Sequence, residues 1–169
     1  MKLPKPEEGL IINYSFLWKH EADQGREEGR KDRPCAVILA HENGRVAVAP
    51  ITHTPPKGAE AIEIPAQVKQ QLGLDHERSW LVTNQANHFT WPGHDIRPIN
   101  RQNPDRMIYG KLPPGMARAV KQEVRRAARD RQLAMVDRDE EQKPKTDRPR
   151  RSSREIAAEK RGRSKGRTR

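Results

Sequence analysis

The feature that most constrains the fold is a pair of apolar segments, 34–40 and 45–51, joined by a polar stretch containing Asn43-Gly44. Asn-Gly is typical of the two-residue type I′ turn, in which both central residues have positive φ. Both segments contain valine and isoleucine, which favour strands. The sequence therefore predicts a β-hairpin that begins at the Arg33-Pro34 pair and ends at Thr52.

Further short strands are expected where β-branched and aromatic residues lie between polar or Gly/Pro-containing stretches. These segments are 10–18, 61–65, 79–85 and 106–113. The segments 19–32 and 87–99 are polar or irregular and predict loops.

Two helices are expected. Residues 65–73 predict a short one, with Pro65 in its first turn and Gly73 at its end. Residues 114–135 predict a longer one, because Met116 and Val120 begin an apolar stripe at helical spacing. Several short strands followed by a late helix indicate a mostly β fold, a small antiparallel barrel or rolled sheet with a C-terminal α-helix.

Charge divides the chain into two parts. Residues 143–169 hold 12 Lys/Arg and 3 Asp/Glu, a charge of +9, whereas the rest of the chain carries only +2 of the total of +11. Apolar residues are sparse after Val136, so this part lacks the means to build a core. We expect a folded domain over 1–136 and a disordered basic tail over 137–169.

The composition also excludes several classes of protein. A single cysteine, Cys35, allows no internal disulfide, and its place in an apolar segment predicts a buried thiol. The six histidines are scattered and there is no cysteine pair, so no metal site and no cofactor is expected. No apolar run reaches the length of a membrane span and no leader segment is evident, which predicts a cytoplasmic protein.

The order of the motifs resembles the MazF/PemK family of toxin ribonucleases. The motifs are "GLIINYSFLW", a charged loop, "RP" before an apolar strand, "PIT" at the end of the next strand, "LVTNQANHFTWPG" and "YGKLPPGMARAVKQEV". Together they cover about Gly9 to Met135.

This resemblance implies an SH3-like barrel of the MazF/PemK/CcdB type that forms a homodimer, binds single-stranded RNA and is inhibited by a small antitoxin protein. It also implies cleavage without a metal, in which the ribose 2′-hydroxyl attacks the adjacent phosphate. The family's catalytic arginine and threonine correspond to Arg33 and Thr52. A guanidinium and a hydroxyl suit this reaction because both can donate hydrogen bonds to the charged phosphate oxygens.

The general base is left open by the sequence. Family members often have a carboxylate and an arginine in the strand that here holds Val82, Asn84 and Asn87, and an amide takes up no proton near neutral pH. His53, beside Thr52, is the preferred candidate, and His88 and the glutamates of the 19–32 loop are the others.

Binding of the RNA itself is assigned to four side chains, Asn84, Gln85, Asn87 and Trp91. Amides can hydrogen-bond the bases, and a tryptophan can stack on one. For Trp91 the alternative is that the ring closes one end of the barrel. Phe89 and Trp91 are both expected in a loop.

Two other functions compete with the ribonuclease. The departures at positions 84 and 87 favour a barrel that has lost cleavage and acts as an RNA-binding or protein-interaction module. The basic tail alone would also suit a ribosomal or nucleoid-type protein.

Deletion of residues 143–169 should leave thermal stability almost unchanged and weaken RNA binding. A flexible polycation contacts phosphates without reading bases, and each contact to a single strand contributes about −0.7 to the slope of log K against log salt. A salt titration of RNA binding, with full-length and truncated protein, measures that slope. An unchanged slope would mean that the tail does not touch RNA.

Overall fold

The computed structural model describes residues 3–139, and the predicted tail beyond them lies outside the described residues. This part of the chain is mostly β, with eight strands and three helices. In chain order they are β1 (Leu10–Tyr14), α1 (Lys19–Asp23), β2 (Arg33–Ala40), β3 (Arg45–Thr52), β4 (Ala61–Glu63), α2 (Ala66–Gln71), β5 (Trp80–Val82), β6 (Gln85–Thr90), β7 (Ile108–Lys111), α3 (Pro114–Arg129) and β8 (Ala134–Asp137).

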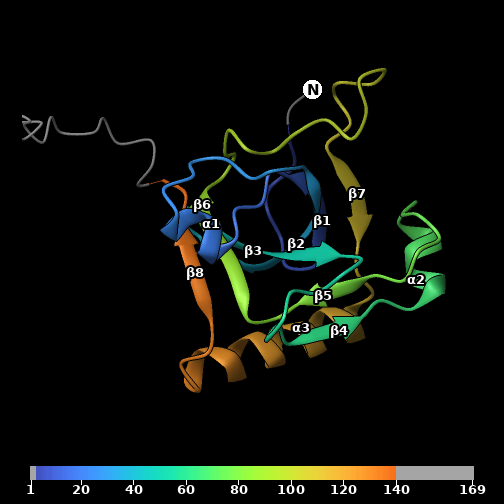
Figure 1. Ribbon diagram of the computed structural model, residues 1–169. Helices are drawn as coiled ribbons and strands as arrows, with labels where there is room; N and C mark the ends of the chain where they lie inside the picture. Colours follow the sequence, from blue (N-terminus) through green and yellow to red (C-terminus); the bar gives the residue numbers. More distant parts are fainter. Residues whose placement is uncertain (1–2, 140–169) are drawn as a thin grey trace, which may run out of the picture.

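The eight strands form one sheet that is antiparallel except for a parallel pairing of β6 with β8. The main path runs β4-β5-β3-β2-β1-β7 (Figure 1). β3 is long enough to pair with two strands on one side, β6 along its first half and β5 at its end. Among the described strands, β4, β7 and β8 each have one neighbour, so the sheet is open and the predicted barrel is not closed.

The predicted hairpin is confirmed as β2 and β3, but the predicted type I′ turn is wrong. Gly44 has a φ of +86°, whereas Asn43 does not share its positive φ. The amide of Gly44 donates to the carbonyl of His41 over 3.1 Å, and the amide of Arg45 donates to Oδ1 of Asn43 over 3.0 Å. The connection is thus a turn centred on Glu42 and Asn43, followed by a left-handed glycine, which is the usual three-residue alternative.

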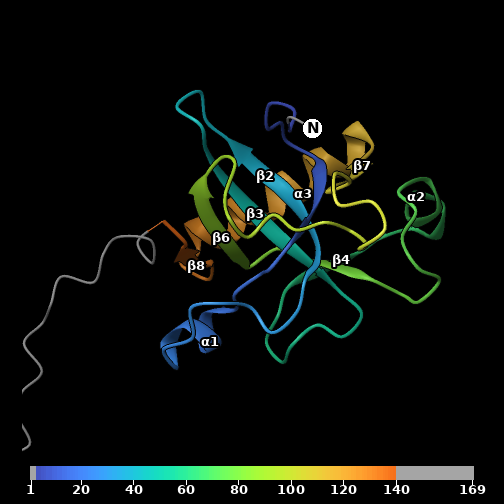
Figure 2. The ribbon, with the colours of Figure 1, turned by 90° about the horizontal axis from the view of Figure 1, so that it is seen from above.

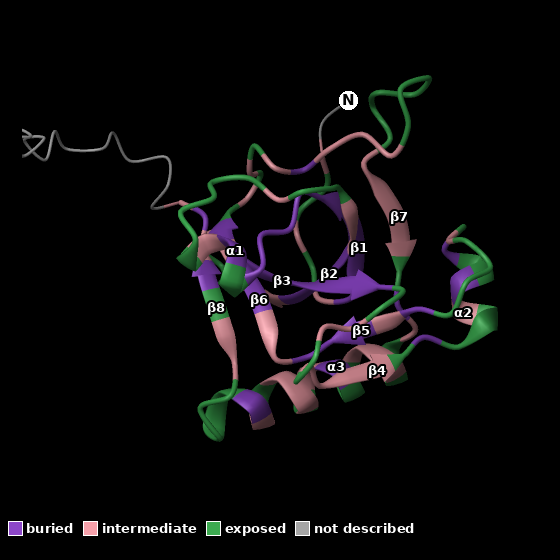
Figure 3. Cartoon of the chain, viewed as in Figure 1, coloured by how far each residue is buried: buried purple, intermediate pink, exposed green. Residues whose placement is uncertain are grey.

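The central strands are buried on both faces. Alternate residues of β1 belong to two separate apolar clusters, with Leu10 and Ile12 in one and Ile11 in the other. α3 covers the second cluster and packs against β2 (Figures 2 and 3). Val120 of α3 is buried in this cluster. Burial on both faces explains why all five residues of "LIINY" are buried and why apolar and polar residues do not alternate along it.

The long helix ends earlier than predicted. α3 ends at Arg129, and Arg131 takes a left-handed φ of +57°. The amides of Arg131 and Gln132 donate to the carbonyls of Ala128 and Ala127, over 3.2 and 2.8 Å, which is the Schellman pattern of helix ends. This position is normally a glycine, so the sequence carried no sign that the helix stops there and β8 follows.

Three other boundaries differ from the predictions. The first strand stops at Tyr14 and not at residue 18, part of the 19–32 segment forms α1, and β6 runs through Thr90 in a segment predicted to be a loop. Phe89 therefore lies on a strand, buried against Tyr14 with ring centroids 5.0 Å apart. Cys35 is buried as predicted, and burial raises the pKa of its thiol.

The folded part also extends past the predicted boundary at residue 136. Arg138 is only 2% exposed. Its guanidinium donates to the carbonyl of Ser15 over 2.8 Å, to the carbonyl of Glu27 over 3.2 Å and to Oδ1 of Asn87 over 3.0 Å, and it lies 3.0 Å from Oδ2 of Asp95. One side chain thus joins β8 to β6 and to the segments around residues 15, 27 and 95.

Arg138→Met should lower the free energy of unfolding by about 3 kcal/mol or more, because it leaves a carboxylate and two carbonyls without their buried partner. Urea unfolding measures the change. Arg125→Met is the matched control, since Arg125 is exposed on α3. A loss no larger than that of the control would show that Arg138 does not stabilise the fold.

Candidate functional site

Arg33 and Thr52 occupy the two ends of the hairpin that the sequence predicts to meet. Cys35 pairs with Pro50 in the antiparallel register of β2 and β3. Counting two residues outward along each strand brings Arg33 opposite Thr52. The hairpin therefore carries a cation and a hydroxyl side by side, at the end of these two central strands that lies away from the turn.

Two adjoining cavities, of about 380 and 440 Å³, lie at this end of β2 and β3. They share four lining residues, Lys31, Arg33, Thr52 and His53. The larger is also lined by Trp18, directly before α1, and by Glu21 on α1. Three predicted catalytic residues, Arg33, Thr52 and His53, thus face one continuous hollow.

The Arg33 guanidinium has an unusual environment for an arginine. It lies over the ring of Trp18, with Cζ 5.2 Å from the ring centroid. Its Nε is buried and has no hydrogen-bond partner among the described residues. Burial lowers the pKa of Arg33, an effect that the nearby Cys35 and Glu21 oppose. A partly desolvated cation with an unused donor is suited to an incoming anion.

Glu21 supplies a carboxylate in the wall of the same cavity. It is 4% exposed, and its Oε2 is buried without a hydrogen-bond partner in the described part of the chain. Its other oxygen lies 3.9 Å from Nε of Arg30. The sequence named the glutamates of this loop as a group, and burial now distinguishes Glu21 from Glu27 and Glu28, which are exposed.

Thr52 and His53 end β3 at the mouth of the cavities. The Thr52 hydroxyl caps the following turn, donating to the carbonyl of Thr54 over 3.2 Å and accepting from its amide over 3.3 Å. His53 contacts two carboxylates, Asp75 and Glu77. Neither acid was a candidate in the sequence, because both lie in the polar loop after α2, where charges are common.

Two of the amides predicted to bind RNA, Asn87 and Asn84, form hydrogen bonds with backbone groups of the protein itself. Asn87 is 0% exposed, and its amide pairs with both backbone groups of Leu17, accepting over 2.9 Å and donating over 2.7 Å. Asn84 accepts from the amide of Glu60 and donates to the carbonyl of Gly58, both over 3.2 Å. Asn87 lines neither cavity; its role is to hold the segment that carries Trp18.

Gln85 and Asn84 line a separate hollow of about 340 Å³. This hollow shares His20 and Pro56 with the larger of the two cavities that contain Arg33. Oε1 of Gln85 accepts from the amide of Lys19 over 3.2 Å. These two amides therefore lie beside the site without facing Arg33.

His88 and Trp91 lie elsewhere. Nδ1 of His88 is 2.7 Å from a guanidinium nitrogen of Arg45, and burial together with that charge lowers the pKa of His88. Trp91 stacks on Phe89 at a centroid distance of 6.4 Å and donates to the carbonyl of Pro4 over 3.1 Å. Neither lines the cavities around Arg33. For Trp91, packing against the core is the role that its contacts support.

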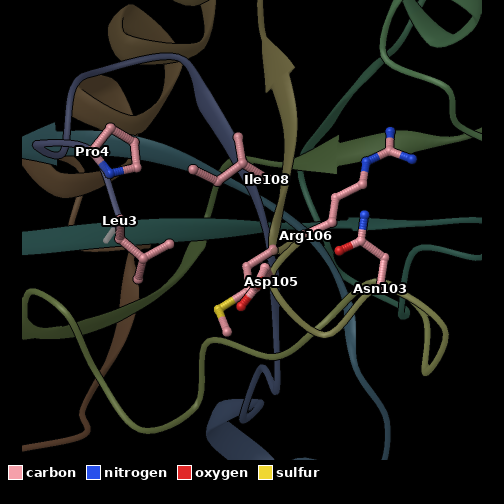
Figure 4. Close-up of a pocket in the computed structure, with 7 residues that line it drawn as sticks. Leu3, Pro4, Asn103, Asp105, Arg106 and Ile108 are labelled. Carbon is pink, nitrogen blue, oxygen red and sulfur yellow. The ribbon is translucent and has the colours of Figure 1, made fainter. Parts of the chain in front are cut away.

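Another cavity, of about 470 Å³, contains none of the predicted site residues (Figure 4). It lies between the N-terminal segment and the approach to β7, and its lining is Leu3, Pro4, Asn103, Asp105, Arg106, Met107 and Ile108. Three of its seven lining residues are polar, and the Arg106 guanidinium points away from Leu3 and Pro4 (Figure 4).

Among residues 3–139, no group of three or more His, Cys, Asp or Glu side chains could hold a metal ion. In the same range, no helix is both long enough and apolar enough to cross a membrane. Compared with known proteins, the chain matches no family model, and no curated protein matches it either.

Arg33 should bind simple oxyanions, and this can be measured without any assay of activity. Phosphate at ten times its Kd should stabilise the parent protein by about 1.4 kcal/mol. Thermal unfolding at constant ionic strength should therefore show a rise in Tm that is lost in Arg33→Met. Arg78→Met is the control, because Arg78 pairs with Glu63 on the surface. An equal rise in all three proteins would be a general salt effect and would contradict an anion site at Arg33.

Proposed function

We propose that this protein is a metal-independent endoribonuclease of the MazF/PemK type, which cleaves single-stranded RNA by attack of the 2′-hydroxyl on the neighbouring phosphate. The observation that carries the proposal is the pair of unused buried polar atoms, Arg33 Nε and Glu21 Oε2, on two residues that line one cavity with Thr52. Buried polar groups normally have partners, and exceptions are concentrated at functional sites.

The roles follow from charge. The attacked phosphate gathers negative charge on its non-bridging oxygens, and Arg33 with the Thr52 hydroxyl would donate hydrogen bonds to them. Glu21 would accept the proton of the 2′-hydroxyl, since a carboxylate with a free oxygen can act as a general base. The reaction leaves a 2′,3′-cyclic phosphate and a 5′-hydroxyl.

The proposal includes the finer fold and the partners. The open sheet with α3 on one face would be a variant of the SH3-like barrel, and the protein would form a homodimer. A small antitoxin protein would inhibit it in the cytoplasm, and the basic tail would add contacts to RNA phosphates.

A second candidate is a module that binds RNA at the same cavity, or binds another protein, without cleavage. It is favoured by the amides at positions 84 and 87, where the family often has ionisable groups. Because these amides are used in internal hydrogen bonds, their chemistry does not bear on the cavity around Arg33.

Purified protein should cut single-stranded RNA in EDTA. Arg33→Ala should lower the rate by about 10² or more, as expected for loss of one contact made in the transition state. Thr52→Val and Glu21→Gln should also slow cleavage, because they remove a donor and a base while nearly keeping the shape. End-group analysis identifies the cyclic phosphate.

Arg78→Ala is the control and should cut like the parent. Binding of RNA without any cleavage would favour the second candidate. Cleavage that requires a metal, or that survives Arg33→Ala at full rate, would contradict the assignment.

A further inference from the structure

His53 is held by two carboxylates, one on each ring nitrogen. Nε2 lies 2.7 Å from Oδ2 of Asp75, and Nδ1 lies 3.2 Å from Oε2 of Glu77. Only an imidazolium can donate from both nitrogens. Each ring nitrogen of His53 thus faces a carboxylate oxygen, and a protonated ring would have one N–H for each of them.

Lys69 holds the Asp75 carboxylate that contacts His53. Nζ of Lys69, on α2, donates to the other oxygen of Asp75 over 2.9 Å and also donates to the backbone carbonyl of Glu77. Lys69 is 5% exposed, which is rare for a lysine. Partial burial raises the pKa of Asp75, but the hydrogen bond from Lys69 and the charges of His53 and Lys69 outweigh it, so the pKa lies below its usual value.

The contact to Glu77 is of a different kind. The side chain of Glu77 is 74% exposed, and its distance to the ring is the longer of the two. Glu77 lines the cavity that also contains Arg33, Thr52 and Glu21, whereas Asp75 lines the neighbouring one. Movement of this surface carboxylate would therefore free Nδ1–H toward the Arg33 side.

We propose, on the basis of the ribonuclease function above, that His53 is the general acid of the reaction and that Asp75 and Lys69 are positioning residues that orient it. Nδ1–H faces the departing 5′-oxygen once the substrate has displaced Glu77, and Nε2–H stays on Asp75. Lys69 holds Asp75 in place through the buried ammonium.

The 2′-oxygen forms a bond to phosphorus, the bond from phosphorus to the 5′-oxygen breaks, and the proton on Nδ1 passes to that oxygen. Glu21 has meanwhile taken the proton of the 2′-hydroxyl. His53 is left neutral with its remaining proton on Nε2, and exchange with water restores both groups.

Several charges act on this donor. Asp75 and Glu77 contact the ring, while Lys31, Arg33, Asp32, His20 and Glu21 line the cavities that it borders. A pH profile alone would therefore mix several titrations. A change of leaving group isolates the proton donated to the 5′-oxygen.

The test compares two short RNAs that differ in one atom, an oxygen or a sulfur at the 5′-bridging position of the scissile bond. A thiolate departs without a proton, so loss of a general acid slows only the oxygen substrate. His53→Gln should cut the oxygen substrate about 10²-fold more slowly, within the range for general acid catalysis, and cut the sulfur substrate close to the parental rate. The change should be in kcat and not in KM.

Asp75→Asn should show the same selective loss, in smaller degree, and Lys69→Met should follow it. Glu63→Gln is the matched control, because Glu63 is a surface carboxylate paired with Arg78, and it should leave both rates unchanged. Circular dichroism verifies folding of each variant. If Lys69→Met does not fold, the isosteric Asp75→Asn variant still tests whether the residues behind His53 affect the oxygen substrate alone.

Three results would overturn the proposal. Equal losses on both substrates would show that His53 binds the phosphate or supports the fold, and unchanged rates would show that it takes no part. A parent protein that cuts neither RNA would instead refute the ribonuclease function itself, and the role of His53 with it.

Discussion

The buried guanidinium of Arg138 is the interaction on which the rest of the structure depends. It lies among carbonyls and a carboxylate from separate segments, and it shares the amide oxygen of Asn87 with the backbone of Leu17. A buried cation is costly unless it is fully partnered. The partners need Arg138 as well, because these carbonyls and the carboxylate would lack a hydrogen-bond donor without its guanidinium. The segment from Ser15 to Glu27 is thereby fixed against β6 and β8.

The arrangement of the candidate site follows from this anchoring. Trp18 and Glu21 belong to the fixed segment, and Arg33 begins the strand that follows it. Trp18 can therefore support the Arg33 guanidinium, and Glu21 can remain buried beside it. The hydrogen bonds of Arg138 go to groups of the protein and stabilise the fold. Arg33, in contrast, has a buried Nε donor without a partner among the described residues. Proteins commonly keep such unsatisfied groups where a ligand is to bind.

Sequence patterns predicted the parts of this fold that local chemistry determines. The hairpin, the strands β4, β5 and β7, the helix α2 and the start of α3 were evident from apolar runs, glycines and prolines. The end of α3 was not, because Arg131 takes a conformation usually left to glycine. The burial of Arg138 could not be predicted from the sequence, for another reason. Within "VDRDEEQK" it looks like one more solvated charge, and only contacts distant in sequence show otherwise.

The candidate site divides in the same way. Arg33 and Thr52 are paired by hairpin register, which a sequence can reveal. The link from Lys69 through Asp75 to His53 joins α2, the loop after it and the end of β3, and no periodicity connects them. The amides Asn84 and Asn87 show the converse, because their internal contacts could not be predicted from the sequence. Their type suits RNA, but in the structure they form hydrogen bonds with backbone groups of Leu17, Gly58 and Glu60.

The position of Arg138 also bears on when the protein can acquire its shape during translation. Every other strand of the sheet, and the whole loop that carries Trp18 and Glu21, emerges from the ribosome before β8 does. Until Arg138 arrives, that loop lacks the side chain at its centre. A nascent chain would thus hold the cavity residues without the anchor that arranges them, and the newborn protein would acquire an ordered site only after Arg138 has emerged.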